Sequence, residues 1–253
     1  MDQDHFMNEA IKIIEAGEKE GIKLRIMGAL AIKYHCSEYS HIHEALDRQF
    51  TDIDFAASSK QEKQIKKLLD RFGYRQKQRG ISRAYSPKGR LILHHETTDL
   101  VADVFFDKLD MCHAFNFHLD MDYPTIPLAD LVLEKLQIVK ITEKDVKDVF
   151  VMLLEHEIGS DDREKIDANL IADLLANDWG FYYTITMNLG KLNKLTNSDM
   201  FKDVIDPQDR EVIIQRLETL QKIIDQKPKS RKWRMRAKIG TKSKWYKEVH
   251  TVH

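Results

Sequence analysis

The hydrophobic pattern of the first half of the chain changes between helical and strand periodicity. Apolar residues recur at helical spacing over residues 4–20, and Gly21 follows as a helix stop. Residues 22–27 (IKLRIM) then alternate as a strand does and run into Gly28 and a group of helix formers. This order predicts a helix, a strand, a tight turn and a second helix.

Strands and one further helix are predicted up to residue 106. Residues 51–57 (TDIDFAA) alternate polar and apolar positions, and Ser59 with Glu62 indicates a capping box for the next helix. Residues 91–95 (LILHH) and 100–106 (LVADVFF) are the clearest strands after it. The first half is therefore expected to be a mixed sheet with helices.

After residue 127 the pattern becomes helical. Three segments have helical periodicity: 128–140, 142–157 and 161–176. Thr142 with Asp145 indicates a helix cap, and Asp206 followed by Pro207 indicates the start of another long helix. We expect an α/β (α+β) chain with a mixed-sheet core over 1–123, a helical domain over 124–226 and a tail over 227–253.

Charge separates the tail from the rest of this 253-residue chain. The formal net charge is −1, but ten Lys or Arg and only one acidic residue, Glu248, lie in residues 227–253, which therefore carry +9. The remainder carries −10. Trp233, Trp245 and Tyr246 lie among the tail cations, a composition that can neutralise phosphates and stack on bases. The alternative is a tail that docks on the acidic body.

Cysteine content and hydropathy restrict the compartment. Cys36 and Cys112 are too few for a disulfide framework and suit a reducing environment. No apolar run approaches the roughly 20 residues of a membrane span, and the N-terminus is acidic where a signal peptide is basic. We expect a cytoplasmic protein with no membrane association.

Three aspartates are the candidate metal ligands. Asp52 and Asp54 point to the same face of a predicted strand, where hard carboxylate oxygens at this spacing suit Mg²⁺. The alternative is a strand with an acidic face in solvent. Asp103 lies in an apolar strand, where a carboxylate needs a cation or a hydrogen-bond network. It could instead be a core aspartate that caps a loop or pairs with an arginine.

Gly28 is the candidate phosphate-binding residue. A strand, a tight turn and a helix start built from small residues let backbone N–H groups approach an anion. Taken by itself, such a turn is more often a plain tight turn than a phosphate-binding one. The turn indicates a phosphate-binding site only together with the aspartates.

The ordered set of these features resembles a known enzyme superfamily. A strand ending at Gly28 and Ala29, a later Asp-Ile-Asp strand, and a third Asp in an apolar strand resemble the nucleotidyltransferases of the DNA polymerase beta superfamily. Further on, residues 127–137 (PLADLVLEKLQ) and 144–149 (KDVKDV) are similar to its abortive-infection toxin branch. The likeness covers roughly residues 22–157.

The resemblance implies an enzyme that moves a nucleoside monophosphate from a nucleoside triphosphate to a hydroxyl acceptor with two Mg²⁺ ions. It implies that Asp52 and Asp54 hold the metals and that Asp103 completes one metal site and helps to activate the acceptor. Two metals clamp the attacking and leaving oxygens of such a displacement. The core would then be a nucleotidyltransferase domain, and the first helices of the helical domain would close over the site.

The resemblance also implies roles for residues around the triphosphate. The Gly28 turn and the Ala29 backbone would hold the triphosphate, and Lys135 would neutralise it as a point charge. Asp145 and Asp148, three apart on one helix face, would be accessory residues near the site. Either acid could instead lie on a solvated helix face, and a lone Lys on an amphipathic helix is usually at the surface.

Several acceptors of the nucleoside monophosphate, and several partners, are compatible with the sequence. RNA bound through residues 227–253, a small hydroxyl compound and a protein side chain are the candidate acceptors. The toxin resemblance implies an antitoxin protein as a partner. The alternative function is a catalytically silent nucleotidyltransferase-like module that binds RNA or a protein.

Overall fold

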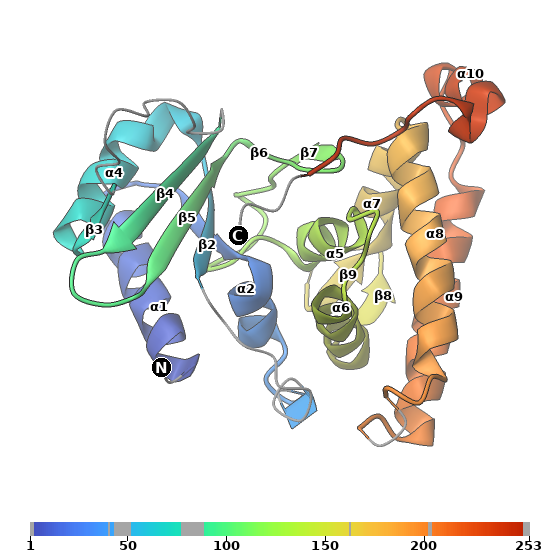
Figure 1. Cartoon of the computed structure of the whole chain (residues 1–253), viewed down its shortest axis with the longest axis horizontal. Helices are drawn as coiled ribbons and strands as arrows, with labels where there is room; N and C mark the ends of the chain where they lie inside the picture. Colours follow the sequence, from blue (N-terminus) through green and yellow to red (C-terminus); the bar gives the residue numbers. More distant parts are fainter. Residues whose placement is uncertain are drawn as a thin grey trace. The chain divides into compact units, whose positions relative to one another are not determined.

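A computed structural model describes residues 3–39, 41–42, 52–76, 89–161, 163–201 and 204–249. Its mixed α/β chain (Figure 1) falls into two compact units. The first unit contains Met1–Tyr34, Gln49–Leu109 and Phe115–Pro127. The second unit contains His35–Arg48, Asp110–Ala114 and Leu128–His253. The 227–253 tail thus belongs to the second unit.

A five-stranded mixed sheet forms the centre of the first unit. In spatial order its strands are β1 (Leu24–Met27), β2 (Ile53–Ala57), β5 (Val101–Phe106), β4 (Arg90–His95) and β3 (Tyr74–Arg75). Strands β2 and β5 pair in parallel, and the other neighbours are antiparallel. The four longer strands arise where the sequence predicts them. The predicted 51–57 strand begins at Ile53, and Thr51 lies outside the described residues.

Helices α1 (Gln3–Lys19) and α4 (Glu62–Arg71) pack on each other and against β1 and β3, respectively. The apolar face that the sequence predicts for α1 is buried: Phe6, Ala10, Ile13 and Ile14 are at most 6% exposed. Helix α2 (Gly28–His35) follows β1 directly. The apolar faces of these helices and the sheet form the core of this unit.

The predicted Ser59–Glu62 capping box is wrong. Residues Ser59–Gln61 form a 3₁₀ turn (η1) before α4, and neither of these two helix starts has a side-chain cap. The backbone N–H of Ser59 instead donates to Oδ1 of Asp107, 3.0 Å away, in the turn after β5. A partner distant in sequence therefore replaces the local cap.

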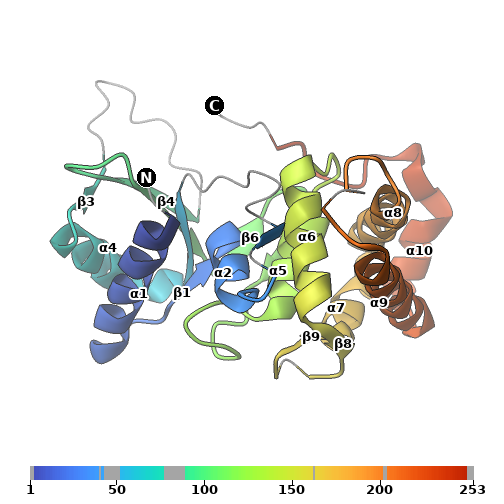
Figure 2. The ribbon, with the colours of Figure 1, turned by 90° about the horizontal axis from the view of Figure 1, so that it is seen from below.

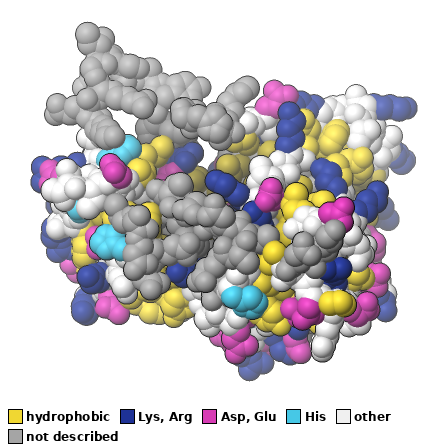
Figure 3. All heavy atoms as spheres, turned by 60° about the horizontal axis from the view of Figure 1, so that its bottom comes forward, with side chains coloured by type: hydrophobic (Ala, Val, Ile, Leu, Met, Phe, Trp, Pro, Cys, Tyr) yellow, Lys and Arg dark blue, Asp and Glu magenta, His cyan; other side chains and the backbone are white. Residues whose placement is uncertain are grey.

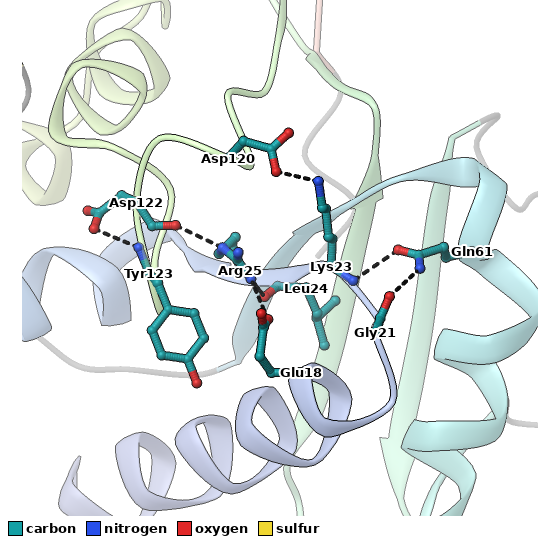
Figure 4. A network of polar contacts seen from close by, with 9 residues as sticks. All are labelled: Glu18, Gly21, Lys23, Leu24, Arg25, Gln61, Asp120, Asp122 and Tyr123. Atoms are coloured by element: carbon teal, nitrogen blue, oxygen red, sulfur yellow. Dashed lines mark hydrogen bonds and ion pairs between the residues drawn. The ribbon is translucent and has the colours of Figure 1, made fainter.

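The segment before Pro127 covers the outer edge of the sheet at β1. The N–H of Ile26 donates to the carbonyl of Pro124, and the N–H of Ile126 donates to the carbonyl of Ile26, both at 2.9 Å. Arg25 is 6% exposed and donates from Nε to the Asp122 carbonyl at 2.8 Å (Figure 4). The backbone groups of an edge strand are thus paired rather than left open.

Further polar contacts join β1 to the start of α4 (Figure 4). Lys23 donates from its backbone N–H to Oε1 of Gln61 at 2.9 Å, and the Gln61 amide donates to the Gly21 carbonyl at 2.7 Å. The Lys23 ammonium pairs with Asp120. These contacts fix the start of β1 relative to α4 within the first unit.

The second unit is largely helical, and Figure 2 shows its helices side by side. They are α5 (Leu128–Leu136), α6 (Glu143–Glu155), α7 (Ala168–Leu175), α8 (Trp179–Thr196), α9 (Pro207–Gln226) and α10 (Arg231–Ile239), and a 3₁₀ turn, η2 (Gly240–Lys242), follows α10. Every residue of α5 is buried, and this helix contacts α6, α7 and α8. The core of the unit therefore lies around α5.

Three of the four predicted helix starts in this unit, at 128, 142 and 206, are confirmed. Thr142 and Asp145 form a reciprocal capping box at α6, and Asp206 caps α9 with Pro207 at the first helical position. The predicted start at residue 161 is wrong, because α7 begins at Ala168. Short paired strands come before it: β8 (Glu157–Gly159) and β9 (Lys165–Asp167).

A short hairpin of β6 (Lys108–Asp110) and β7 (Ala114–Asn116) lies in sequence where the chain passes between the units. Its tip, Asp110–Ala114, belongs to the second unit. Within the part of the chain that the structure describes, no helix combines the length and the apolar character needed to cross a bilayer.

Candidate functional site

The turn between β1 and α2 packs against an aspartate of the sheet. Gly28 has φ +70°, and Met27 just before it is the register partner of Asp54 on β2. A Cβ atom added to Gly28 would lie 2.5 Å from Oδ2 of Asp54. Both the backbone conformation and this approach require glycine here, so backbone and carboxylate meet at close range.

Asp54 and Asp103 are neighbours across the parallel pair β2 and β5. They are register partners. Paired residues of adjacent strands point to the same face of a sheet, and the strands lie about 4.8 Å apart. The structure therefore brings two of the three predicted aspartates together beside Gly28. Asp52 comes just before β2, and its charge acts on both Asp103 and Arg90.

Arg90, at the start of β4, neutralises the buried aspartate. Its Nε donates to Oδ1 and Oδ2 of Asp103, each at 2.8 Å, and its Nη2 contacts Oδ2 as well. The Asp103 side chain is 3% exposed and that of Arg90 is 35% exposed. The guanidinium also lies over the Phe105 ring, 4.7 Å from its centroid. An arginine partner thus compensates the burial of Asp103.

Burial and pairing act in opposite directions on the pKa of Asp103. Desolvation raises this pKa above its ordinary value, and the hydrogen bonds from Arg90 counteract the rise. The pKa of Arg90 is raised, first by its hydrogen bonds to Asp103 and also by the charges of Asp54 and Asp52. Arg90 is therefore the cation of a local cluster of three aspartates.

The donor chemistry of this cluster suits a hard divalent cation, because Asp52, Asp54 and Asp103 offer only carboxylate oxygens. As the side chains lie, however, the described residues contain no group of three or more His, Cys, Asp or Glu arranged to hold a metal ion. Both oxygens of Asp103 are engaged by Arg90. A cation that used Asp103 would have to take the place of Arg90.

Lys135 and Asp148 come together in the second unit. The Lys135 ammonium lies 3.2 Å from Asp148 and 3.1 Å from Glu134, and the Asp148 side chain is fully buried. Each charge thus has a partner within the helical core. The predicted roles of Lys135 at a phosphate and of Asp148 as an accessory residue stay predictions.

Asp145 serves the start of α6. Its Oδ2 accepts from the Thr142 backbone N–H at 3.0 Å and from the Thr142 hydroxyl at 2.6 Å. This is the capping role that the sequence predicts for it.

Ala29, a predicted phosphate-binding residue, lies in the first turn of α2, where helix N–H groups have no intrahelical partner.

The chain after Lys227 docks on α8. The Trp233 ring lies 5.1 Å from that of Tyr182, and the Trp245 ring lies 5.1 Å from that of Tyr183. A Cβ atom at Gly180 would lie 2.5 Å from the Trp245 carbonyl oxygen, so this contact is close. Docking on the body, one of the two interpretations of the tail, is what the structure contains.

A buried hydrogen-bonded group anchors the end of this segment. Trp245 donates from Nε1 to the Thr184 hydroxyl at 3.1 Å, and His113 Nε2 lies 2.8 Å from the same hydroxyl. His113 also stacks on Phe181 at 4.8 Å. Burial lowers the pKa of His113 to about 4, so this imidazole is neutral at pH 7.

Arg90 belongs to the cluster but is not among the site residues predicted from the sequence. Its only local signal is a cation directly after Gly89, at the start of the strand containing LILHH. The partner, Asp103, lies on the neighbouring strand 13 residues later. Cross-strand register, which the sequence pattern does not specify, creates the pair.

No family model, curated protein or solved structure matches the chain. A function for the chain is therefore inferred from residues of the first unit: the Gly28 turn, the aspartates and Arg90.

Proposed function

We propose that the chain is a Mg²⁺-dependent nucleotidyltransferase that moves a nucleoside monophosphate from a nucleoside triphosphate to a hydroxyl acceptor. The observation that carries the proposal is the close approach of the Gly28 turn to Asp54, beside the paired Asp54 and Asp103. A phosphate-binding turn needs a backbone that a ligand can approach closely, as glycine allows, and the metals of a triphosphate need carboxylates next to it. A glycine turn and two carboxylates lie together in this one sheet.

Each residue of the cluster has a role in this proposal. The turn at Gly28 and the first N–H groups of α2, including that of Ala29, bind the phosphates of the nucleotide. Asp52, Asp54 and Asp103 would hold Mg²⁺, which would supply charge neutralisation for the phosphoryl transfer. Arg90 would have to release Asp103 for this, and its guanidinium would then be a cation available to the phosphates.

The proposal extends to the toxin branch that residues 127–137 and 144–149 resemble. In that case the chain is the toxin of a toxin–antitoxin pair, and an antitoxin protein is its partner. Lys135 is the proposed phosphate-neutralising cation of this branch, and it would have to exchange Asp148 and Glu134 for the nucleotide.

A second function has one observation in its favour. Because Arg90 compensates the buried Asp103, the acidic cluster is stable without a metal and can be purely structural. A catalytically silent module that binds RNA or a protein would retain the fold and the ion pair alike. Only an activity measurement separates the two functions.

Transfer of label tests the proposal. The protein is incubated with each α-³²P nucleoside triphosphate, Mg²⁺ and total RNA, and labelled macromolecules are separated by gel. We expect Mg²⁺-dependent labelling that Asp54→Asn abolishes and that Asp120→Asn, an exposed change in the same unit, leaves intact. Labelling that survives Asp54→Asn overturns the assignment, and folded protein that labels no acceptor favours the silent module.

A further inference from the structure

Residues 227–249, which we call the α10 segment, separate their aromatic and basic side chains. The two tryptophans face α8: Trp233 contacts Tyr182, and Trp245 contacts Tyr183 and Thr184, while Tyr246 contacts Trp245 within the segment. The basic residues are mostly exposed along α10 and η2. The tryptophan rings are thus engaged with the body of the second unit rather than presented for stacking on bases.

Half of the cations of the α10 segment have ionic, backbone or aromatic partners. Lys227 pairs with Asp173 and Lys247 with Asp110, both outside the segment, whereas Lys244 pairs with Glu248 inside it. Lys229 donates to backbone carbonyls, among them that of Ile224 in α9, and Arg236 lies over the Trp179 ring of α8. Four of these five side chains therefore join the segment to the rest of the second unit.

The other five cations form what we call the α10 surface. They are exposed, and within the described part of the chain none of them has a carboxylate partner: Arg231, Lys232, Arg234, Lys238 and Lys242. Lys and Arg side chains, dark blue in Figure 3, lie at several places on the right-hand part of the face shown there, among acidic and apolar side chains. Unneutralised charge concentrated on one helix attracts a polyanion.

The spacing of these cations suits a phosphodiester backbone. Arg231, Arg234 and Lys238 are three and four residues apart and therefore lie along one side of α10. The first and last of them are about 10 Å apart along the axis, a length that spans several phosphates at about 3.4 Å per nucleotide of a stacked strand. Phosphates can thus be neutralised in sequence along the helix.

A lipid surface fits less well. Among the described residues of α10, only Met235 and Ile239 are exposed large apolar side chains, at 69% and 49%. The Trp residues that would anchor a helix in a membrane interface pack on α8 instead. The exposed surface is mainly charge.

We propose that the α10 surface binds the phosphodiester backbone of nucleic acid through charge and without base stacking. Binding is therefore insensitive to sequence and sensitive to salt. That the bound nucleic acid is an RNA that supplies the acceptor hydroxyl rests on the proposed function. The binding surface itself does not.

The test compares two variants of the full chain with equal net charge. One carries Gln at the five positions of the α10 surface. The control carries Gln at five Lys residues of α1 and of the η1–α4 region: Lys12, Lys19, Lys60, Lys63 and Lys67. Affinity for a fluorescent 20-nucleotide RNA, for DNA of the same sequence and for phosphatidylserine vesicles is measured from 50 to 300 mM KCl, without nucleotide or Mg²⁺.

We expect the α10 variant to lose about tenfold or more in RNA and DNA affinity at 50 mM KCl and the slope of log K against log salt to fall by about 3, because each single-strand phosphate contact contributes about 0.7. The control keeps affinity within about twofold, and the two variants melt at similar temperatures. Equal losses in both variants, unchanged RNA binding in the α10 variant, or loss of vesicle binding alone would each overturn the proposal.

The same proteins separate this inference from the proposed function. If RNA binds through α10 but no acceptor is labelled, the α10 binding surface is supported and the proposed enzyme activity is rejected. If an acceptor is labelled but the protein does not bind RNA, the enzyme activity is supported and the α10 binding surface is rejected.

Discussion

Replacing Arg90 by Met should destabilise the first unit by leaving the Asp103 carboxylate without its cation. Removing one partner of a buried ion pair costs about 3–5 kcal/mol, and the 35% exposure of the Arg90 side chain reduces this to about 2 kcal/mol through solvent screening. Urea unfolding of the wild type, Arg90→Met, Asp103→Asn and the double variant gives the coupling energy. We expect the sum of the two single-variant losses in unfolding free energy to exceed the loss in the double variant by about 1–2 kcal/mol.

The dependence of this loss on pH has a definite sign. Burial already raises the pKa of Asp103, and without Arg90 the folded-state pKa rises further above that of the unfolded chain. The folded protein then binds more protons than the unfolded one, so stability falls as the pH rises through the folded-state pKa. The deficit of Arg90→Met should therefore be smaller at pH 5 than at pH 8.

Two results would contradict a coupled Arg90–Asp103 pair. If the sum of the single-variant losses equals the loss in the double variant within about 0.5 kcal/mol, the two side chains do not couple. A deficit that grows toward pH 5 would contradict the sign. The exposed pair Lys23–Asp120 provides a matched cycle, which should couple much more weakly than Arg90–Asp103.

Mg²⁺ adds a direct link to the proposed function. In Arg90→Met, bound Mg²⁺ can supply the lost positive charge, so 5 mM Mg²⁺ should raise the melting temperature of this variant more than that of the wild type. Equal shifts in both proteins would argue against a metal at Asp103.

Three further predictions follow from the described contacts. Gly28→Val should abolish calorimetric binding of Mg²⁺–triphosphate, because the new side chain meets Asp54, whereas Gly190→Ala, with open space around it, should not. Trp245→Ala should lower the free energy of unfolding by about 2 kcal/mol through lost packing and a lost hydrogen bond, measured in urea. The pKa of His113 lies at about 4, below its ordinary value near 6.5, so the unfolded chain binds the proton first. Stability should therefore fall between pH 6.5 and 4, by about 3 kcal/mol from this group, and His113→Gln should flatten the slope of unfolding free energy against pH.

Local signals account for what the sequence predicted well. The strands around Asp54 and Asp103 and the caps at Thr142 and Asp206 depend on residues within a few positions of each other. Alternation of apolar residues and cap chemistry act at that range. The gathering of Gly28 with Asp54 needed in addition the pairing of β1 with β2.

Contacts between distant residues account for the rest. Arg90 meets Asp103 only because β4 and β5 pair in one register. The pairing of β8 with β9 replaces the first residues of the helix expected from residue 161. Trp245 packs on α8 some 60 positions earlier in the chain. Each of these contacts depends on tertiary pairing, which local sequence patterns do not specify.

Transfer of the α-phosphate with release of pyrophosphate distinguishes a nucleotidyltransferase from other enzymes that use nucleoside triphosphates. Nucleoside triphosphate labelled at either the α- or the γ-phosphate is incubated with the protein, Mg²⁺ and RNA, and both products are quantified. We expect α-label in the acceptor, γ-label in pyrophosphate in equal amount, and loss of both with Asp54→Asn. Transfer of the γ-label to the acceptor, or no Mg²⁺-dependent product from folded protein, would show that the chain is not a nucleotidyltransferase.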